Sequence, residues 1–263
     1  MKEKGIAGKT FMFQGFGNVG YWAAKFIEQD GGKVTHIIER DCSIYKKDGF
    51  NVEHAKAYYI ENKTFIGYEE ADETEVKDPM SMLTREVDFI IPAATEKSIH
   101  KQNAGQIKCK AIFEGANGPT TYAAEEILLK KGIICAPDLL VNGGGVTCSY
   151  FEWLKNIDHV SPGKMTKKFD EQSQIKLLSL MGYTEMNDQI KGADEIDIVY
   201  SALDEIMTNA VHTNWKYAVD NNLNFRDACL VNAMMKIYNH YKECGITMWL
   251  KNNIKEEYLK ELK

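Results

Sequence analysis

The chain has 263 residues, 44% of them hydrophobic and 27% charged, so it can bury a sizeable core and resembles neither a disordered chain nor a fibre. Its formal net charge of −6 argues against general binding to nucleic acid or to an anionic membrane, since both favour a basic surface. No apolar run approaches the roughly 18 residues of a membrane-spanning helix. The six cysteines are scattered without metal-site spacing, which suits structural thiols in a reducing compartment and predicts no metal site.

A glycine-rich motif follows the first apolar run of the chain. Residues 10–14 predict a buried strand, Gly15, Gly17 and Gly20 follow with the spacing G-x-G-x-x-G, and residues 21–29 predict a helix. In a dinucleotide fold the first glycine allows a tight turn, the second lets the backbone approach a pyrophosphate, and the third lets the helix pack against the strand. The helix N-terminus supplies free N–H groups for the phosphates. Alone this motif is weak evidence, because glycines also gather in ordinary turns.

An acidic residue at the end of the second strand strengthens the motif. Residues 34–38 predict that strand, and Glu39 ends it at the spacing expected for a carboxylate that binds the adenosine ribose. A carboxylate there favours a 2′-hydroxyl, and hence NAD over NADP. Arg40 beside it is a guanidinium that suits a 2′-phosphate, so the choice between the two coenzymes stays open.

Short apolar runs alternate with helical patterns through the first half of the chain. In order, the sequence predicts a loop at 41–49, a helix at 52–62, an acidic surface stretch at 69–78, strands at 87–91 and 111–113, a helix at 121–131 capped by Thr120 or Thr121, and a strand at 133–136. This alternation predicts an α/β fold with a Rossmann-like, doubly wound parallel sheet.

Helical patterns dominate after a run of three glycines at 143–145. The sequence predicts a helix at 146–156, an excursion without sustained periodicity at 158–192, a long helix at 195–221, a second at 226–244 capped by Asn224 and ended by Gly245, and a charged tail at 251–263.

Five loops follow the predicted parallel strands, at 15–20, 39–41, 92–96, 114–121 and 137–145. In a doubly wound sheet they share the carboxyl edge, where ligands bind. Ala93 and Ala94 are small enough for a flat ring to pass close to the backbone, and Asn117 and Asn142 each carry an amide that suits a ribose or a carboxamide. A single asparagine is more often a turn residue, but five such loops on one edge favour a binding site.

Several motifs in order carry a resemblance to glutamate dehydrogenase. They are QGFGNVG at 14–20, IPAA at 91–94, EGANGPTT at 114–121, PDL at 137–139, GGVT at 144–147 and SYFEWLKN at 149–156. The chain resembles the coenzyme-binding half of the hexameric type that carries an antenna. The resemblance implies a Rossmann core at 1–156, a shortened antenna-like insertion at 157–193, pivot and C-terminal helices at 194–247 and a charged tail at 248–263.

The resemblance also implies the site. Pyrophosphate would be held by Gly15, Gly17, Asn18, Val19 and Gly20, and the adenosine ribose by Glu39. Ala93, Ala94 and Asn117 would line the nucleotide, Asn142 would meet the nicotinamide end, and Val146 and Ser149 would touch the glutamate substrate. The coenzyme would be NAD or NADP, with NAD favoured.

The family's reaction is oxidative deamination of L-glutamate to 2-oxoglutarate and ammonium, and its catalytic lysine and aspartate belong to an N-terminal domain. None of the glycine-rich stretches at 15–20, 115–118 and 143–145 contains a lysine, so we expect no catalytic residue in this chain. Two interpretations follow: the coenzyme-binding half of a glutamate dehydrogenase, inactive alone, or a catalytically dead relative serving as a structural or interaction subunit. Protein partners or a homo-oligomer are expected. By resemblance the location would be mitochondrial, although no presequence is visible, with the cytoplasm as the alternative.

Overall fold

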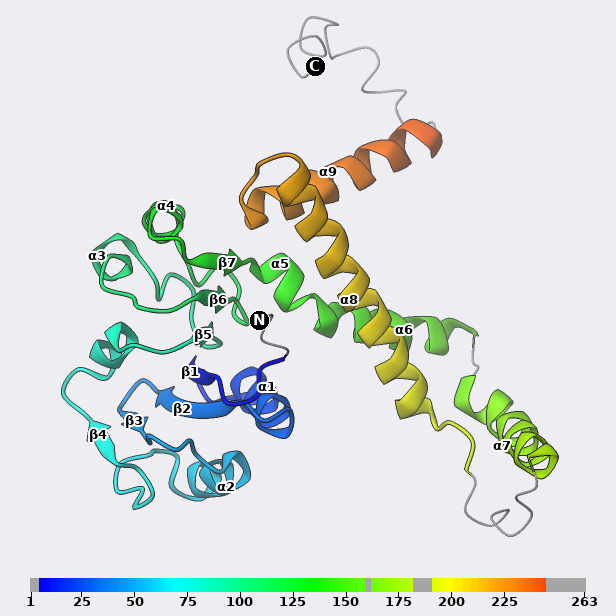
Figure 1. The fold of residues 1–263 in the computed structure, drawn as a ribbon, viewed down its shortest axis with the longest axis horizontal. Coiled ribbons are helices and arrows are strands. Elements are labelled where there is room, and N and C mark those ends of the chain that lie inside the picture. The colour runs from blue at the N-terminus through cyan, green and yellow to red at the C-terminus, as the bar shows by residue number, and fades with distance from the viewer. Residues whose placement is uncertain (1–4, 159–161, 182–190, 245–263) are drawn as a thin grey trace, which may run out of the picture. The chain divides into compact units, whose positions relative to one another are not determined.

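The structure is a computed structural model that describes residues 5–158, 162–181 and 191–244. The chain divides into two compact units, residues 1–212 and 213–263. The first unit contains a mixed sheet with helices on both faces (Figure 1). The predicted tail at 251–263 and the helix end at Gly245 lie outside the described residues.

A seven-stranded sheet organises the described part of the first unit. Its strands are β1 (Thr10–Gln14), β2 (Lys33–Ile38), β3 (Ser43–Tyr45), β4 (Glu73–Glu75), β5 (Phe89–Pro92), β6 (Ala111–Phe113) and β7 (Ile134–Ala136), in the spatial order β4-β3-β2-β1-β5-β6-β7. Five neighbouring strands, β2, β1, β5, β6 and β7, run parallel to one another. At one edge of the sheet, β3 pairs antiparallel with β2, and β4 pairs antiparallel with β3. The predicted doubly wound α/β fold is therefore confirmed.

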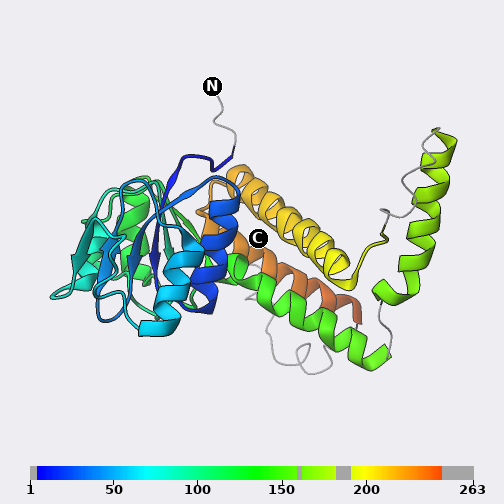
Figure 2. The same ribbon diagram turned by 90° about the horizontal axis from the view of Figure 1, so that it is seen from below.

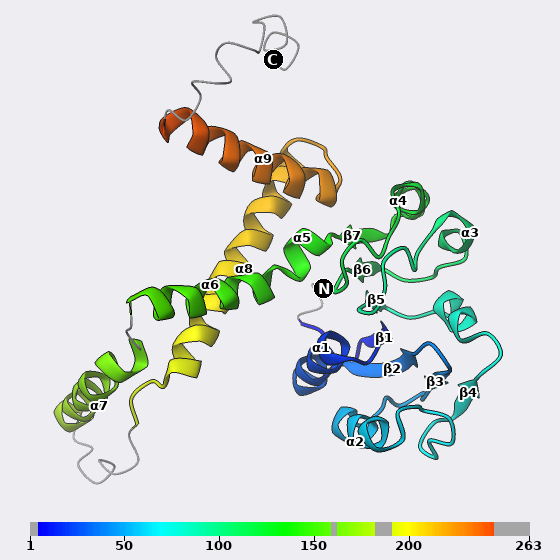
Figure 3. The same ribbon diagram turned by 180° about the vertical axis from the view of Figure 1, so that it is seen from behind.

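Helices cover both faces of the sheet, because successive side chains of a strand point to opposite faces and both faces therefore carry apolar side chains. The helices here are α1 (Asn18–Gln29), α2 (Val52–Asn62), α3 (Lys101–Ala104), α4 (Tyr122–Lys130) and the 3₁₀ helix η1 (Pro79–Thr84). Phe11 and Phe13 of β1 pack in a cluster with α1 and α2, whereas Met12 packs in a second cluster with η1, α3 and α4. Figures 1 and 2 show the two groups of helices on opposite sides of the strands, and Figure 3 shows them from behind.

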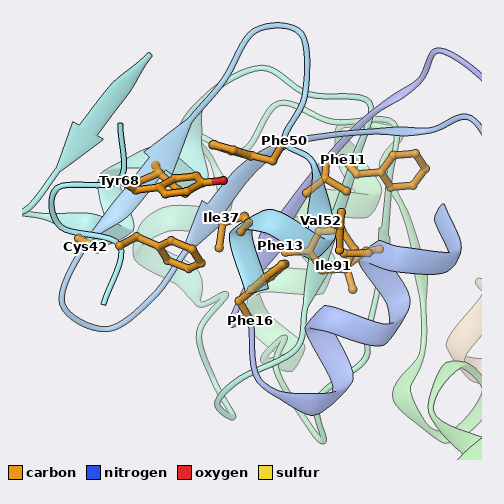
Figure 4. Close-up of a cluster of buried hydrophobic side chains, with 14 residues drawn as sticks. Phe11, Phe13, Phe16, Ile37, Cys42, Phe50, Val52, Tyr68 and Ile91 are labelled. Atoms are coloured by element: carbon orange, nitrogen blue, oxygen red, sulfur yellow. The ribbon is translucent and has the colours of Figure 1, made fainter. Parts of the chain in front are cut away.

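The first cluster is rich in aromatic side chains (Figure 4). Phe16, which comes from the glycine-rich loop, is fully buried in it and packs edge-on against Phe65 and Tyr21. A residue between two glycines of the loop thus belongs to the hydrophobic core. This anchoring holds the loop against α2 before any ligand is present.

The remaining helices are α5 (Asp138–Val141), α6 (Gly143–Asp158), α7 (Pro162–Leu180), α8 (Glu195–Asp220) and α9 (Phe225–Cys244). Two predicted caps are confirmed: the Thr121 hydroxyl accepts the N–H of Ala124, and the Asn224 side chain accepts the N–H of Asp227. None of the six cysteines, all of which lie in the described residues, forms a disulfide bond. None of the described helices is long and apolar enough to cross a membrane.

Four segments differ from the sequence prediction. The loop at 41–49 contains β3, and the acidic stretch at 69–78 contains β4, because backbone pairing at a sheet edge does not require an apolar pattern. The excursion at 158–192 contains the long helix α7. The predicted loop at 137–145 contains the short helix α5, and its glycines at 143–145 form the first turn of α6.

Candidate functional site

The order of the parallel strands reverses between β1 and β5. From β1 the chain builds outward through β2, β3 and β4, and it then returns to β5 on the other side of β1. Loops at such a reversal leave in opposite directions and open a crevice at the carboxyl edge, the usual ligand position in this class of sheet. The glycine-rich loop follows β1, and Ala93 and Ala94 follow β5, so both border this reversal.

Small residues let the two loops touch at the reversal. A β-carbon added to Gly15 would lie 2.6 Å from the β-carbon of Ala94, and Gly15 has a φ of +95°, which side chains rarely tolerate. A β-carbon at Gly20 would lie 2.0 Å from the Gly15 carbonyl oxygen and 3.7 Å from the β-carbon of Ala93. The turn therefore needs glycine at both positions, as the motif predicted.

Gly17 differs because its surroundings are open. It is the N-cap residue of α1, it makes no side-chain capping hydrogen bond, and a β-carbon added there would meet nothing within 4 Å. Asn18 and Val19, the first helical residues, are exposed beside it. The start of α1 consequently borders open space, and the free N–H groups of a helix's first turn suit an anion.

Glu39, which follows β2, is hydrogen-bonded to the glycine-rich loop. Its Oε1 accepts the backbone N–H of Phe16 at 2.5 Å, which ties the end of β2 to the glycine-rich loop. The Tyr59 hydroxyl of α2 lies beside it, and burial together with the negative charge of Glu39 raises the pKa of Tyr59. The predicted ribose carboxylate is thus already held in place by the loop that would carry the pyrophosphate.

Lys56 is a basic residue of this corner that sequence reasoning missed. Its Nζ donates to the carbonyl oxygen of Phe16 at 3.2 Å and lies 5.0 Å from the ring centroid of Tyr21 and 5.8 Å from that of Tyr59. Burial lowers the pKa of the Lys56 ammonium, while the nearby carboxylate of Glu39 acts in the opposite direction. Lys56 belongs to α2 and carries no motif spacing, so only the fold brings it here.

A second group of hydrogen bonds joins the loops after β6 and β7. The Asn142 amide donates to the Asn117 side-chain oxygen at 2.7 Å, so these two predicted residues meet. The buried Glu114 accepts the N–H of Asp138 at 2.9 Å, and Asp138 accepts the N–H of Gly118 at 2.8 Å. Sequence reasoning quoted Glu114 and Asp138 within motifs but did not assign them a role, and they hold these loops together.

The two predicted substrate residues lie on α6. Val146 is 72% exposed, and the exposed Ser149 donates its hydroxyl to the Gly145 carbonyl oxygen one turn earlier. Among the described residues, neither side chain is hydrogen-bonded to the side chain of Asn117 or Asn142. No group of three or more His, Cys, Asp or Glu residues in the described ranges is arranged to hold a metal ion.

These features define a Rossmann-like α/β domain, the fold of the coenzyme-binding domain of glutamate dehydrogenases. The family model described as Glutamate/Leucine/Phenylalanine/Valine dehydrogenase matches residues 1–245, and the chain belongs to this family.

Similar proteins agree with this assignment. The mitochondrial glutamate dehydrogenase of Dictyostelium discoideum is 45% identical over 249 residues, which are 92% of this chain and 49% of that protein. The crystal structure of glutamate dehydrogenase from Peptoniphilus asaccharolyticus matches with a TM-score of 0.63 and 29% identity, covering 90% of this chain and 47% of the other. A hetero-hexameric glutamate dehydrogenase from Thermus thermophilus, with a TM-score of 0.69 and 21% identity over 88% of this chain and 46% of the other, shares the fold. The chain spans about half the length of the relatives it matches.

Proposed function

We propose that this chain is the coenzyme-binding half of a glutamate dehydrogenase, and that a nicotinamide dinucleotide binds along the carboxyl edge of its sheet. The observation that carries the proposal is the open start of α1 at Gly17, where an added β-carbon would meet nothing within 4 Å, beside the contact between Gly15 and Ala94 at the strand reversal. Packing accounts for glycine at positions 15 and 20, but it does not account for glycine at position 17. A dinucleotide does, because its backbone must lie close to the protein backbone.

Each part of the coenzyme has a matching group in the chain. Gly15, Gly17, Asn18, Val19 and Gly20 would hold the pyrophosphate at the start of α1. Glu39 would bind the adenosine ribose with the carboxylate oxygen that Phe16 does not occupy, and Ala93, Ala94 and Asn117 would line the nucleotide. Asn142 would face the nicotinamide, and Val146 and Ser149 would contact the substrate. When bound, the coenzyme supplies the hydride acceptor.

The carboxylate of Glu39 favours NAD over NADP. The carboxylate could accept hydrogen bonds from the ribose hydroxyls, whereas a 2′-phosphate would bring a second negative charge beside it. We therefore infer that NAD is the preferred coenzyme.

The substrate chemistry of the whole enzyme would need a base and a proton carrier. We propose that L-glutamate is oxidised to 2-oxoglutarate only together with the domain that carries the family's catalytic lysine. None of the glycine-rich stretches of this chain supplies such a lysine. In this scheme residues 1–156 form the coenzyme-binding core, and residues 157–193, which include α7, form a shortened antenna-like insertion.

Titration of the purified chain with NADH, followed by calorimetry or by coenzyme fluorescence, tests the proposal. We expect a micromolar dissociation constant, competition by NAD, and no formation of NADH from glutamate by the chain alone. Absence of binding at millimolar coenzyme would reject the proposed function and would favour the structural or interaction subunit. Turnover of glutamate by the pure chain would refute the proposal that the catalytic lysine belongs to another domain.

The proposal extends to the oligomeric state of the protein and to its location in the cell. We infer a hetero- or homo-oligomer, because the Thermus thermophilus relative is described as hetero-hexameric. We also infer a mitochondrial location from the name of the Dictyostelium discoideum relative. Light scattering of the purified chain and fractionation of the source cells would test these two points, and a cytoplasmic location is the alternative outcome.

A further inference from the structure

Two oppositely charged side chains hold the backbone of Phe16 from both sides. Glu39, at the end of β2, accepts its N–H at 2.5 Å, and Lys56, on α2, donates to its carbonyl oxygen at 3.2 Å. The carboxylate of Glu39 acts on the ammonium of Lys56, since it raises the pKa of Lys56 against the larger lowering effect of burial.

Lys56 is held more firmly than a surface lysine. Its ammonium lies 5.9 Å from the ring centroid of Phe16, 5.0 Å from that of Tyr21 and 5.8 Å from that of Tyr59. Three aromatic faces and one carbonyl oxygen fix the position of a cation to which no carboxylate of the described residues is hydrogen-bonded. A lysine held in this way is a pre-positioned charge for an anion that arrives beside Glu39.

The anion that fits this position is a phosphate on the adenosine ribose. If Glu39 binds the ribose hydroxyls, a 2′-phosphate would lie next to the carboxylate and would be repelled by it. A neighbouring ammonium offsets that repulsion and can donate hydrogen bonds to the phosphate oxygens. Resting on the proposed function, we propose that Lys56 is a specificity-determining residue that allows the chain to bind NADP as well as NAD.

Arg40 is the obvious competitor for this role, because it follows Glu39 directly in the sequence. It is exposed, and no hydrogen bond, ion pair or ring contact fixes its guanidinium among the described residues. A flexible, solvated side chain must be ordered by the ligand, whereas Lys56 is ordered by the protein. The structure therefore assigns the 2′-phosphate to Lys56 rather than to Arg40.

Binding of NAD and NADP to the full chain, measured by calorimetry for the wild type and four variants, tests this assignment. We expect the wild type to bind both coenzymes with dissociation constants within about tenfold of each other. Lys56→Met, which keeps the apolar stem, should weaken NADP binding roughly 10- to 100-fold, the loss usual for a hydrogen bond to a charged group, and change NAD binding less than about threefold. Lys56→Arg should retain NADP binding, and Arg40→Met should leave it within about threefold.

Lys25→Met is the matched control, because Lys25 on the neighbouring helix α1 is also held over an aromatic ring, that of Trp22, but forms an ion pair with Glu53. It should leave both affinities unchanged. Equal weakening of both coenzymes by Lys56→Met would mean that Lys56 only supports the loop, and loss of NADP binding in Arg40→Met but not in Lys56→Met would assign the phosphate to Arg40. Either result overturns the inference.

If Lys56→Met does not fold, ligand binding by the wild-type chain alone still tests the inference. Adenosine 2′,5′-bisphosphate and adenosine 5′-monophosphate differ only in the 2′-phosphate, and we expect the wild-type chain to bind the two with dissociation constants within about tenfold of each other. Binding of the bisphosphate more than about tenfold weaker would overturn the inference while leaving the proposed function intact. Absence of binding by every adenine ligand and coenzyme would reject the proposed function, and this inference with it.

Discussion

Gly20→Ala separates the structural role of the glycine-rich loop from its role in binding. Gly20 is buried near the start of α1, and an added β-carbon would lie 2.0 Å from the Gly15 carbonyl oxygen and 3.0 Å from the Gly15 carbonyl carbon. Both are backbone atoms, so no side chain can rotate away to make room. The substitution must displace either the turn at Gly15 or the first turn of α1.

The size of the effect follows from two opposing contributions. Alanine favours a helix over glycine by about 1 kcal/mol, and overpacking of this kind costs roughly 1–3 kcal/mol. Because a contact of 2.0 Å is severe, the upper end of that range applies, and we expect a net destabilisation of about 2 kcal/mol. For a unit of this size the melting temperature should fall by about 4–8 °C. Thermal unfolding followed by circular dichroism measures the change.

Gly17→Ala is the matched control. An added β-carbon there meets nothing within 4 Å, and Gly17 has a φ of −69°, which alanine also adopts. We expect a melting temperature within about 2 °C of the wild type, since the substitution removes only backbone freedom. NADH binding should nevertheless weaken at least about tenfold, because the methyl group occupies the space next to the proposed pyrophosphate.

Three results would refute this reasoning. A melting temperature of Gly20→Ala equal to that of the wild type would show that the turn adapts without cost. Destabilisation by Gly17→Ala as large as that by Gly20→Ala would show that the open space at Gly17 is not real. Unchanged NADH affinity in a well-folded Gly17→Ala chain would place the pyrophosphate elsewhere.

Three further predictions concern other parts of the sheet domain. Burial lowers the pKa of His36 to about 4, so the unfolded chain takes up a proton near pH 6.5 while the folded chain does not. The free energy of unfolding should therefore fall by about 2–3 kcal/mol between pH 7 and pH 4.5, and urea titrations should show a smaller fall in His36→Asn; equal falls would contradict the assignment. Thr121→Ala removes the cap of α4 and should lower the unfolding free energy by about 1 kcal/mol in the same assay, whereas Thr121→Ser should not. Asn117→Ala removes the acceptor of the exposed Asn142 amide; it should lower the unfolding free energy by less than about 1 kcal/mol yet weaken NADH binding in calorimetry, and an unchanged affinity would remove Asn117 from the site.

The parallel strands and the loops that follow them could be predicted from the sequence, because each combines an apolar run with glycine, alanine or asparagine at its end. The helix at 52–62 and the strand at 111–113 agree with the structure residue for residue. The edge strands could not be predicted, since β4 reads Glu-Thr-Glu and owes its form to pairing with β3. Helix α7 has too weak an apolar pattern to be recognised.

The residues around Glu39 show why the proposed binding site could be predicted only in part from the sequence. Glu39 was recognisable because its distance from the glycines along the chain is set by the length of one helix and one strand. Lys56 was not, because it reaches the site through the backbone of Phe16, from a helix whose docking depends on the aromatic cluster. Spacing along the chain carries no information about a contact of that kind.

The ligand-facing groups of the edge already have partners within the chain. Glu39 holds the N–H of Phe16, Asn142 holds Asn117, and Asp138 holds the N–H of Gly118. Each of these carboxylates and amides nevertheless has further hydrogen-bonding capacity, because a carboxylate offers two oxygens and an amide both donates and accepts. A coenzyme would therefore add bonds to groups that are already oriented, and little of its binding energy would be spent on ordering the loops. An edge organised in this way fits the proposal that this chain binds a nicotinamide coenzyme while another domain supplies the catalytic lysine.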